Sequence, residues 1–146
     1  MNLEIAMKRV QATTFAFYLK SHNFHWNVEG PDFYQYHKFL DDLYTEVWGA
    51  VDAIAEHVRA LDIYVPGSFA RFSELSAIED QTEIPRAALM IEELYHDNEV
   101  VIHTLIEAYQ LAETKHLGLA NFLQDRIDVH EKHGWMLRSL LKVQRA

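Results

Sequence analysis

The sequence contains no cysteine, so neither disulfide bonds nor thiolate chemistry contributes to the structure or function of the protein. No run of about 18 apolar residues is present, so no membrane-spanning segment is expected. The first residues include Glu4 and lack the apolar stretch of a signal peptide. These absences fit a cytoplasmic protein, and that is the location we expect.

Basic residues are also scarce. The chain of 146 residues has 13 lysines and arginines against 22 aspartates and glutamates, which gives a net charge of −9. Such a chain repels nucleic acid unless a basic patch or tail offsets its charge.

Glycine and proline, which interrupt helices, occur only five and three times. The long stretches without them predict four long helices, over about 3–28, 32–62, 82–114 and from the break at Gly118 to the C-terminus. Pro31 and Pro85 are expected in the first turns of the second and third helices, with Thr82 as the cap of the third.

Four long helices with short links predict an all-α four-helix bundle, formed by one domain over residues 1–146. The link between the second and third helices, at about 63–84, is longer than the others and contains a short helix in the segment SFARFSELSAI. A long crossover at this place is typical of the ferritin-like topology.

Four potential metal ligands lie on one face of the second helix. At about 100° per residue, His37, Asp41, Asp52 and Glu56 fall within an arc of about 100°. However, Asp41 and Asp52 are about 16 Å apart along the axis, too far for one ion to bind both. One chain therefore carries two separate half-sites.

A second copy of the helix, packed antiparallel around a two-fold axis, would join these half-sites. In such an antiparallel pair, residues of the two copies lie opposite each other when their numbers have the same sum. The numbers of His37 and Glu56 sum to 93, as do those of Asp41 and Asp52, so one dimer would bring both pairs opposite each other. Two-fold interfaces are the commonest in oligomers. His25, at the end of the first helix, could reach the same place around the Gly-Pro turn.

Two imidazoles and three carboxylates suit a first-row metal such as iron. The alternative is that these acids form an ordinary solvated helix face, because acidic side chains four residues apart are common there. Tyr44 and Trp48 lie on or beside the same face, which argues against a purely solvated one.

The segment HNFHWNVEGPDFYQYHKFLDDLYTEVWGAVDAIAEHVRALD resembles the Dps family of mini-ferritins, also called DNA-binding proteins from starved cells. The family pattern of His-Trp, Gly-Pro, His four residues before Asp, and Asp-x-x-x-Glu is complete here. Near the C-terminus, HEKHGWMLRSLL resembles the last helix of the family, so the resemblance spans nearly the whole chain.

The resemblance implies a hollow homododecamer that oxidises Fe²⁺, preferably with H₂O₂ rather than O₂, and stores ferric mineral. It implies ferroxidase sites at two-fold interfaces, with His25, His37 and Asp41 from one chain and Asp52 and Glu56 from another. It also suggests that Trp26 and Tyr44 intercept stray oxidising equivalents, whereas core packing is their ordinary alternative.

Other candidate ligands are weaker. The pairs Glu93/His96 and Glu113/His116 match the Glu-x-x-His motif of a metal centre inside one bundle, but they lie about 30 Å apart and have no partner motif. The family implies pore-lining carboxylates near the start of the last helix, where a solvated face is the simpler reading. The remaining histidines are expected to be satisfied or exposed. The carboxylates are Asp125, Asp128 and Glu131, and the remaining histidines are His22, His57, His103, His130 and His133.

Two other functions compete with iron storage: a nucleoid protein that shields DNA, and an inert shell without catalysis. Family members that bind DNA usually use flexible basic tails, whereas this chain offers Lys8 and Arg9 at one end and Arg138, Lys142 and Arg145 at the other. Twelve copies would carry a charge on the order of −100, so DNA binding is expected to be weak. The complete ligand set argues against the inert shell.

Overall fold

The computed structural model describes residues 1–142 and contains four long helices and one short one. They are α1 (Leu3–Asn27), α2 (Phe33–Ala60), α3 (Phe69–Leu75), α4 (Ala87–Ala112) and α5 (Leu117–Leu141). The predicted all-α, ferritin-like four-helix bundle with a crossover helix is confirmed.

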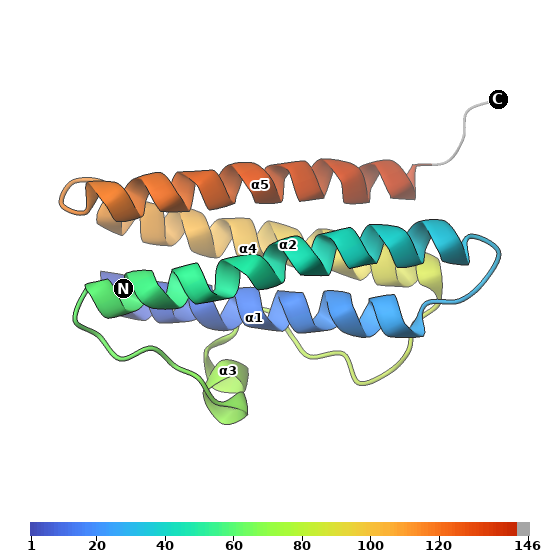
Figure 1. Cartoon of the computed structure of the whole chain (residues 1–146), viewed down its shortest axis with the longest axis horizontal. Coiled ribbons are helices and arrows are strands. Elements are labelled where there is room, and N and C mark those ends of the chain that lie inside the picture. Colours follow the sequence, from blue (N-terminus) through green and yellow to red (C-terminus); the bar gives the residue numbers. More distant parts are fainter. Residues whose placement is uncertain (143–146) are drawn as a thin grey trace.

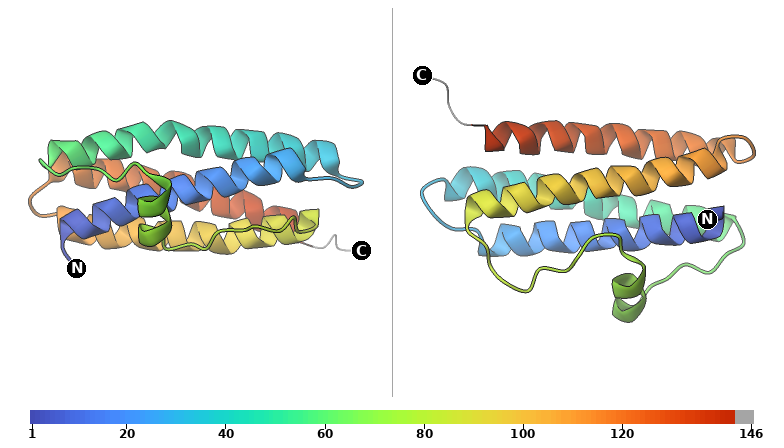
Figure 2. Two further views of the ribbon diagram at one scale, coloured as in Figure 1. Left: turned by 90° about the horizontal axis from the view of Figure 1, so that it is seen from below. Right: turned by 180° about the vertical axis from the view of Figure 1, so that it is seen from behind.

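Two antiparallel helix pairs, α1 with α2 and α4 with α5, form the bundle (Figure 1). The segment that links α2 to α4 runs along the length of the bundle and carries α3 on the outside of α1 (Figure 2). Because this crossover returns the chain to the end where α2 began, α2 and α4 run in the same direction. No helix in the part of the chain described, 1–142, is long and apolar enough to cross a membrane.

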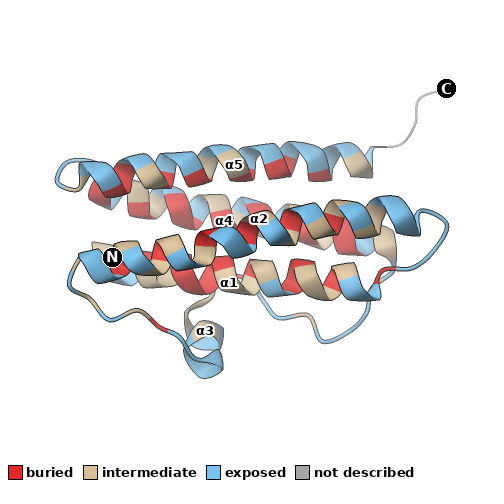
Figure 3. Cartoon of the chain, in the orientation of Figure 1, coloured by how far each residue is buried: buried red, intermediate tan, exposed pale blue. Residues whose placement is uncertain are grey.

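The core follows from apolar side chains at helical spacing. In α2 the buried residues recur every three or four positions, namely Leu40, Leu43, Val47, Ala50, Ile54 and Val58. Buried positions on all four long helices face the interior of the bundle (Figure 3). Each fully buried leucine or isoleucine contributes about 1.5–3 kcal/mol. This packing fixes which face of α2 remains available to a partner.

Both predictions that place proline in a first helical turn are wrong. The helices α2 and α4 begin at Phe33 and Ala87, two residues after Pro31 and Pro85. Arg86 is the N-cap of α4 and its backbone is extended, with ψ 159°, so the helix cannot start earlier. Thr82 is therefore not the cap.

The last helix also ends earlier than predicted. The helix α5 stops at Leu141, and Lys142 follows as a C-cap with extended backbone. Lys142 therefore does not extend the helical face of Arg138, and Arg145 lies outside the described residues.

Candidate metal centre

His25 and His37 form a matched pair where α1 and α2 join. The Nδ1 atom of His25 lies 2.8 Å from the backbone oxygen of His37, and the Nδ1 atom of His37 lies 2.9 Å from the backbone oxygen of His25. The two rings stack with centroids 3.9 Å apart and planes 15° from parallel. A carbonyl oxygen can only accept, so each Nδ1 donates a proton and each Nε2 keeps its lone pair. This tautomer is the one that binds a metal ion through Nε2.

The turn between the helices brings these two rings together. Val28 ends α1 with an extended backbone, and its N–H still donates to the carbonyl of Phe24 at 2.9 Å. Gly30 follows with φ 121°, a conformation that side chains disfavour, and its carbonyl accepts from the N–H of Phe33 at 3.1 Å. A glycine at this position therefore lets the chain reverse within a few residues and places His25 against His37.

Asp41 lies one helical turn after His37, on the same side of α2. Burial and the neighbouring His25 lower the pKa of His22, while the negative charge of Asp41 acts in the opposite direction. Asp41 is thus near the same group of rings. His25, His37 and Asp41 form what we call the histidine half-site.

Asp52 and Glu56 form the second group, the acidic half-site, further along α2. Both side chains are exposed. A hydrogen bond with Asp52, and the repulsion between the two carboxylates, raise the pKa of Glu56. Two carboxylates whose charges repel each other in this way favour a cation between them.

The two half-sites do not meet within one chain. The eleven residues between Asp41 and Asp52 span about 16 Å of helix. Within residues 1–142, no three histidine or acidic side chains are placed to hold one ion. The site predicted from the sequence is therefore incomplete in a single chain, and a site shared between two copies stays a prediction.

An aromatic layer covers the histidine half-site. His22 stacks on Tyr44 with ring centroids 3.7 Å apart. It also packs against Trp26 at 3.9 Å with the planes tilted by 34°, and its Nδ1 lies 2.9 Å from the hydroxyl of Tyr18. Sequence reasoning gave His22 no part in the site, although the spacing of Tyr18, His22 and Trp26 at i, i+4 and i+8 marks one helix face. Trp26 is 59% exposed in the single chain, so core packing does not explain it.

A second polar group, which the sequence analysis missed, lies inside the bundle. Glu46 on α2 accepts hydrogen bonds from Arg126 and His133 on α5, with contacts of 2.5 and 2.7 Å. Burial alone would raise the pKa of Glu46, but these hydrogen bonds lower it to about 2. Burial and the charge of Arg126 hold the pKa of His130 well below its usual range. The i, i+4 pair Arg126/His130 was the available signal.

The alternative Glu-x-x-His motifs serve other purposes or lie off the helix. Glu93 accepts from the side chain of Gln81 at 2.8 Å and lies 3.2 Å from the buried Lys20 amine. The helix α4 ends at Ala112, so Glu113 and His116 lie in the link to α5. Neither pair therefore forms half of a centre within the bundle.

The remaining predicted candidates are dispersed. His57 packs against Phe122 with ring centroids 4.4 Å apart, and His103 lies 3.1 Å from Glu107. His130 and His133 are buried and hydrogen-bonded, so these histidines are satisfied, as expected. Three acids on α5 are exposed, which agrees with a solvated face: Asp125, Asp128 and Glu131.

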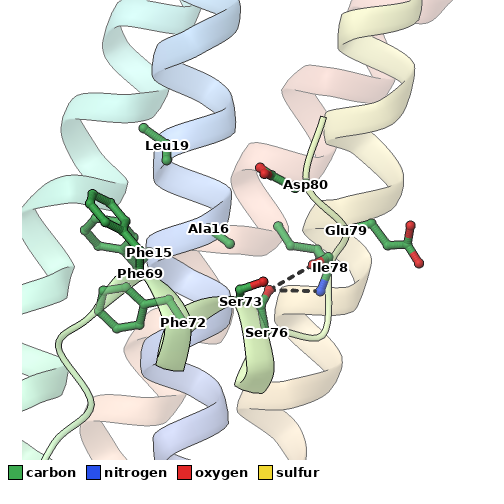
Figure 4. Close-up of a pocket in the computed structure, with 10 residues that line it drawn as sticks. All are labelled: Phe15, Ala16, Leu19, Phe69, Phe72, Ser73, Ser76, Ile78, Glu79 and Asp80. Carbon is green, nitrogen blue, oxygen red and sulfur yellow. Dashed lines mark hydrogen bonds between the residues drawn. The ribbon is translucent and has the colours of Figure 1, made fainter. Parts of the chain in front are cut away.

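A cleft of about 700 Å³ lies between α1 and the crossover, and none of its lining residues belongs to either half-site (Figure 4). Phe15 and Phe72 stack in its wall with ring centroids 4.5 Å apart. The hydroxyl of Ser76 bonds the backbone of Ile78 and shapes the opposite side. Its lining contains Glu79 and Asp80 but no histidine, so it does not resemble the histidine half-site.

Comparison with known proteins gives a consistent result. Residues 6–146 match the model of the ferritin-like domain. The chain is 32% identical over 139 residues to the DNA protection during starvation protein of Brevibacillus brevis, covering 94% of this chain and 93% of the relative.

Solved structures agree with this match. Dps from Thermosynechococcus elongatus superposes with a TM-score of 0.93 at 25% identity, covering 97% and 91% of the two chains. Dps from Vibrio cholerae O1, described as a member of a broad superfamily of ferritin-like diiron-carboxylate proteins, superposes with a TM-score of 0.91 at 26% identity, covering 96% and 89%.

Proposed function

The chain belongs to the Dps family of ferritin-like proteins, and from this premise we propose that it is an iron-storage mini-ferritin with ferroxidase activity. In this proposal, Fe²⁺ is the substrate, and H₂O₂ is preferred to O₂ as its oxidant. The observation that carries the proposal is the histidine pair, whose two Nε2 lone pairs are left free by reciprocal hydrogen bonds to the backbone.

The stacking of the pair supports two metal positions rather than one. An imidazole lone pair lies in the plane of its own ring, and the planes of His25 and His37 are 15° from parallel with centroids 3.9 Å apart. The two lone pairs therefore point along separate planes and do not converge on one ion. Two neighbouring ions, one at each ring, fit this arrangement and the diiron-carboxylate description of the Vibrio cholerae relative.

The acidic half-site of a second copy would complete the centre. The two-fold register that pairs His37 with Glu56 and Asp41 with Asp52 forms two composite sites in each dimer. We propose that six such dimers build a hollow homododecamer in which ferric mineral accumulates. Each site would then have two imidazoles from one chain and carboxylates from both chains.

The division of roles follows from the chemistry of these side chains. Carboxylates of Asp41, Asp52 and Glu56 bind hard iron ions and balance the positive charge that increases during oxidation. The imidazoles are neutral ligands that their backbone hydrogen bonds orient. Two Fe²⁺ ions would supply two electrons, and solvent two protons, to reduce one H₂O₂ to two waters, so no hydroxyl radical is released. We propose that Trp26 and Tyr44, beside the site, give up electrons to stray oxidants.

Anaerobic Fe²⁺ titration followed by addition of peroxide tests this function. We expect the His25→Ala/His37→Ala variant to lose saturable Fe²⁺ binding and rapid peroxide-driven oxidation. His103→Ala is a matched control because the side chain of His103 is 71% exposed and lies beside Glu107, outside both half-sites. If the double variant oxidises iron as fast as the control, the assignment of the site is wrong.

A nucleoid-protecting role is the second candidate, because the Brevibacillus brevis relative is named for DNA protection. The net charge of −9 opposes it, since every subunit would repel DNA phosphates. Iron oxidation without DNA binding is therefore the expected behaviour.

A further inference from the structure

The polar cluster inside the bundle is arranged around one cation, the guanidinium of Arg126. Its Nη1 atom lies 2.5 Å from Oε2 of Glu46, and its Nη2 atom lies 3.2 Å from Oε1 of Glu46 and 3.1 Å from Nε2 of His130. His133 reaches Oε1 of Glu46 at 2.7 Å. One carboxylate and two imidazoles from α2 and α5 thus gather near a single positive charge.

The ring of His130 is oriented as a metal-binding histidine is oriented. Its Nδ1 lies 2.8 Å from Oδ1 of Asn98, and the amide of Asn98 donates to the backbone oxygen of His130 at 2.8 Å. Since the Asn98 oxygen can only accept, Nδ1 carries the proton and the Nε2 lone pair faces Arg126. A ring held by its Nδ1–H, with a free Nε2, is the usual arrangement behind a metal ligand.

The surroundings hold this group rigidly. Asn98 and His130 are fully buried, and Arg126 is 6% exposed. Gly134 leaves room for Asn98, because a Cβ on that glycine would lie 3.1 Å from Nδ2 of the amide. A half-buried carboxylate with two buried imidazoles is a ligand set that divalent first-row metals use, and ferritin-like proteins often place such sets inside the bundle.

We propose that Arg126 is a built-in cation that occupies a latent divalent-metal site inside the bundle and closes it to metal ions. The guanidinium keeps its charge at every physiological pH, so it repels an incoming cation permanently. Metal chemistry would then be confined to the composite sites on α1 and α2. This inference concerns residues outside the composite sites and does not depend on the proposed ferroxidase activity.

The geometry requires a modest contraction once the guanidinium is removed. Metal bonds to nitrogen and oxygen are about 2.0–2.2 Å, whereas the contacts of Nη2 with His130 and Glu46 are 3.1 and 3.2 Å. Each side chain must therefore move inward by about 1 Å. The Nε2–H of His133 donates to Glu46, so His133 binds the ion only after this nitrogen releases its proton to solvent and turns toward the ion.

Replacement of Arg126 with the uncharged Arg126→Met, and with Arg126→Gln, tests the proposal with Co²⁺ as probe. Both changes are made in the His25→Ala/His37→Ala background, so that the composite sites do not contribute. We expect about one Co²⁺ per chain beyond the parent, with visible absorption of a low-coordinate ion and a higher Tm when Co²⁺ is present. Adding Glu46→Gln to either variant should abolish the new site.

Several outcomes decide the matter. If the folded variants bind no more Co²⁺ than the parent, or if the parent itself binds an ion that Glu46→Gln removes, the proposal is wrong. If a variant is unfolded without metal, refolding driven by Co²⁺, followed by circular dichroism, supports the proposal. A failure of Co²⁺ to refold both variants overturns it. A ferroxidase failure would appear instead in the protein that retains His25 and His37.

Discussion

Neutralising Glu46 should destabilise the protein and remove part of the pH dependence of its stability. The pKa of Glu46 falls from 4.5 to about 2 in the folded protein. At about 1.4 kcal/mol per unit, this difference corresponds to about 3.4 kcal/mol. The Glu46 side chain is 35% exposed, and solvent screening reduces the contribution to about 2 kcal/mol. For a chain of this length, Glu46→Gln should therefore lower Tm at pH 7 by about 5–7 °C.

The sign of the pH dependence follows from the direction of the shift. Because the folded pKa is the lower one, the stabilisation is fully present above the unfolded value of 4.5 and disappears as the pH falls toward 2. Glutamine does not titrate, so the difference between wild type and variant should shrink over that range. Asp97, whose burial raises its pKa, changes stability in the opposite direction but is common to both proteins.

Urea unfolding followed by circular dichroism, at one protein concentration and several pH values, measures this difference. Glu99→Gln is the matched control, since Glu99 is exposed on α4. A Glu46→Gln variant as stable as the control at pH 7, or a difference that stays constant between pH 6 and pH 2.5, would refute the role of the Glu46 hydrogen bonds.

Three further predictions concern other features, two of them substitutions and the third DNA binding. Gly134→Ala should lower the free energy of unfolding by about 1–2 kcal/mol, although alanine is a better helix former than glycine. The new Cβ would lie 3.1 Å from the amide nitrogen of Asn98, which is buried and hydrogen-bonded in place. An unchanged Tm in thermal unfolding would contradict this. Gly30→Ala should lower the free energy of unfolding by about 1–2 kcal/mol and weaken Fe²⁺ binding, because a residue with a side chain is strained at φ 121°. An Fe²⁺ affinity equal to that of the wild type would show that the turn does not position the histidines. In a gel-shift assay at physiological salt, duplex DNA should remain unbound; nanomolar binding would overturn the charge argument.

The fold was largely predictable because its signals are local. Scarce glycine and proline, and apolar residues at intervals of three and four, define the long helices, and the length of the link before α4 defines the crossover. Exact starts were not predictable from Pro31 and Pro85. A proline fits a first turn and an extended approach equally well, and only the backbone at Arg86 distinguishes the two.

The histidine half-site was partly predictable, whereas the internal cluster was not. His37 and Asp41 follow from helical spacing, but the reciprocal hydrogen bonds of His25 depend on how the turn at Gly30 folds. Glu46 looks like any other acid on α2, and its partner Arg126 lies 80 residues away. The i, i+4 spacing of Arg126 and His130 is a local signal, but it does not point to Glu46, because contacts across that distance depend on packing between helices.

Mixing two inactive variants tests the shared metal centre most directly. His37→Ala/Asp41→Ala lacks most of the histidine half-site, and Asp52→Ala/Glu56→Ala lacks the acidic one. Neither should bind Fe²⁺ at a complete site alone. After co-refolding in equal amounts, about half of the dimers would be mixed, and each mixed dimer would have one intact site of two. The account predicts that anaerobic Fe²⁺ titration recovers about a quarter of the wild-type sites. A mixture that binds no more Fe²⁺ than the separate variants would contradict it.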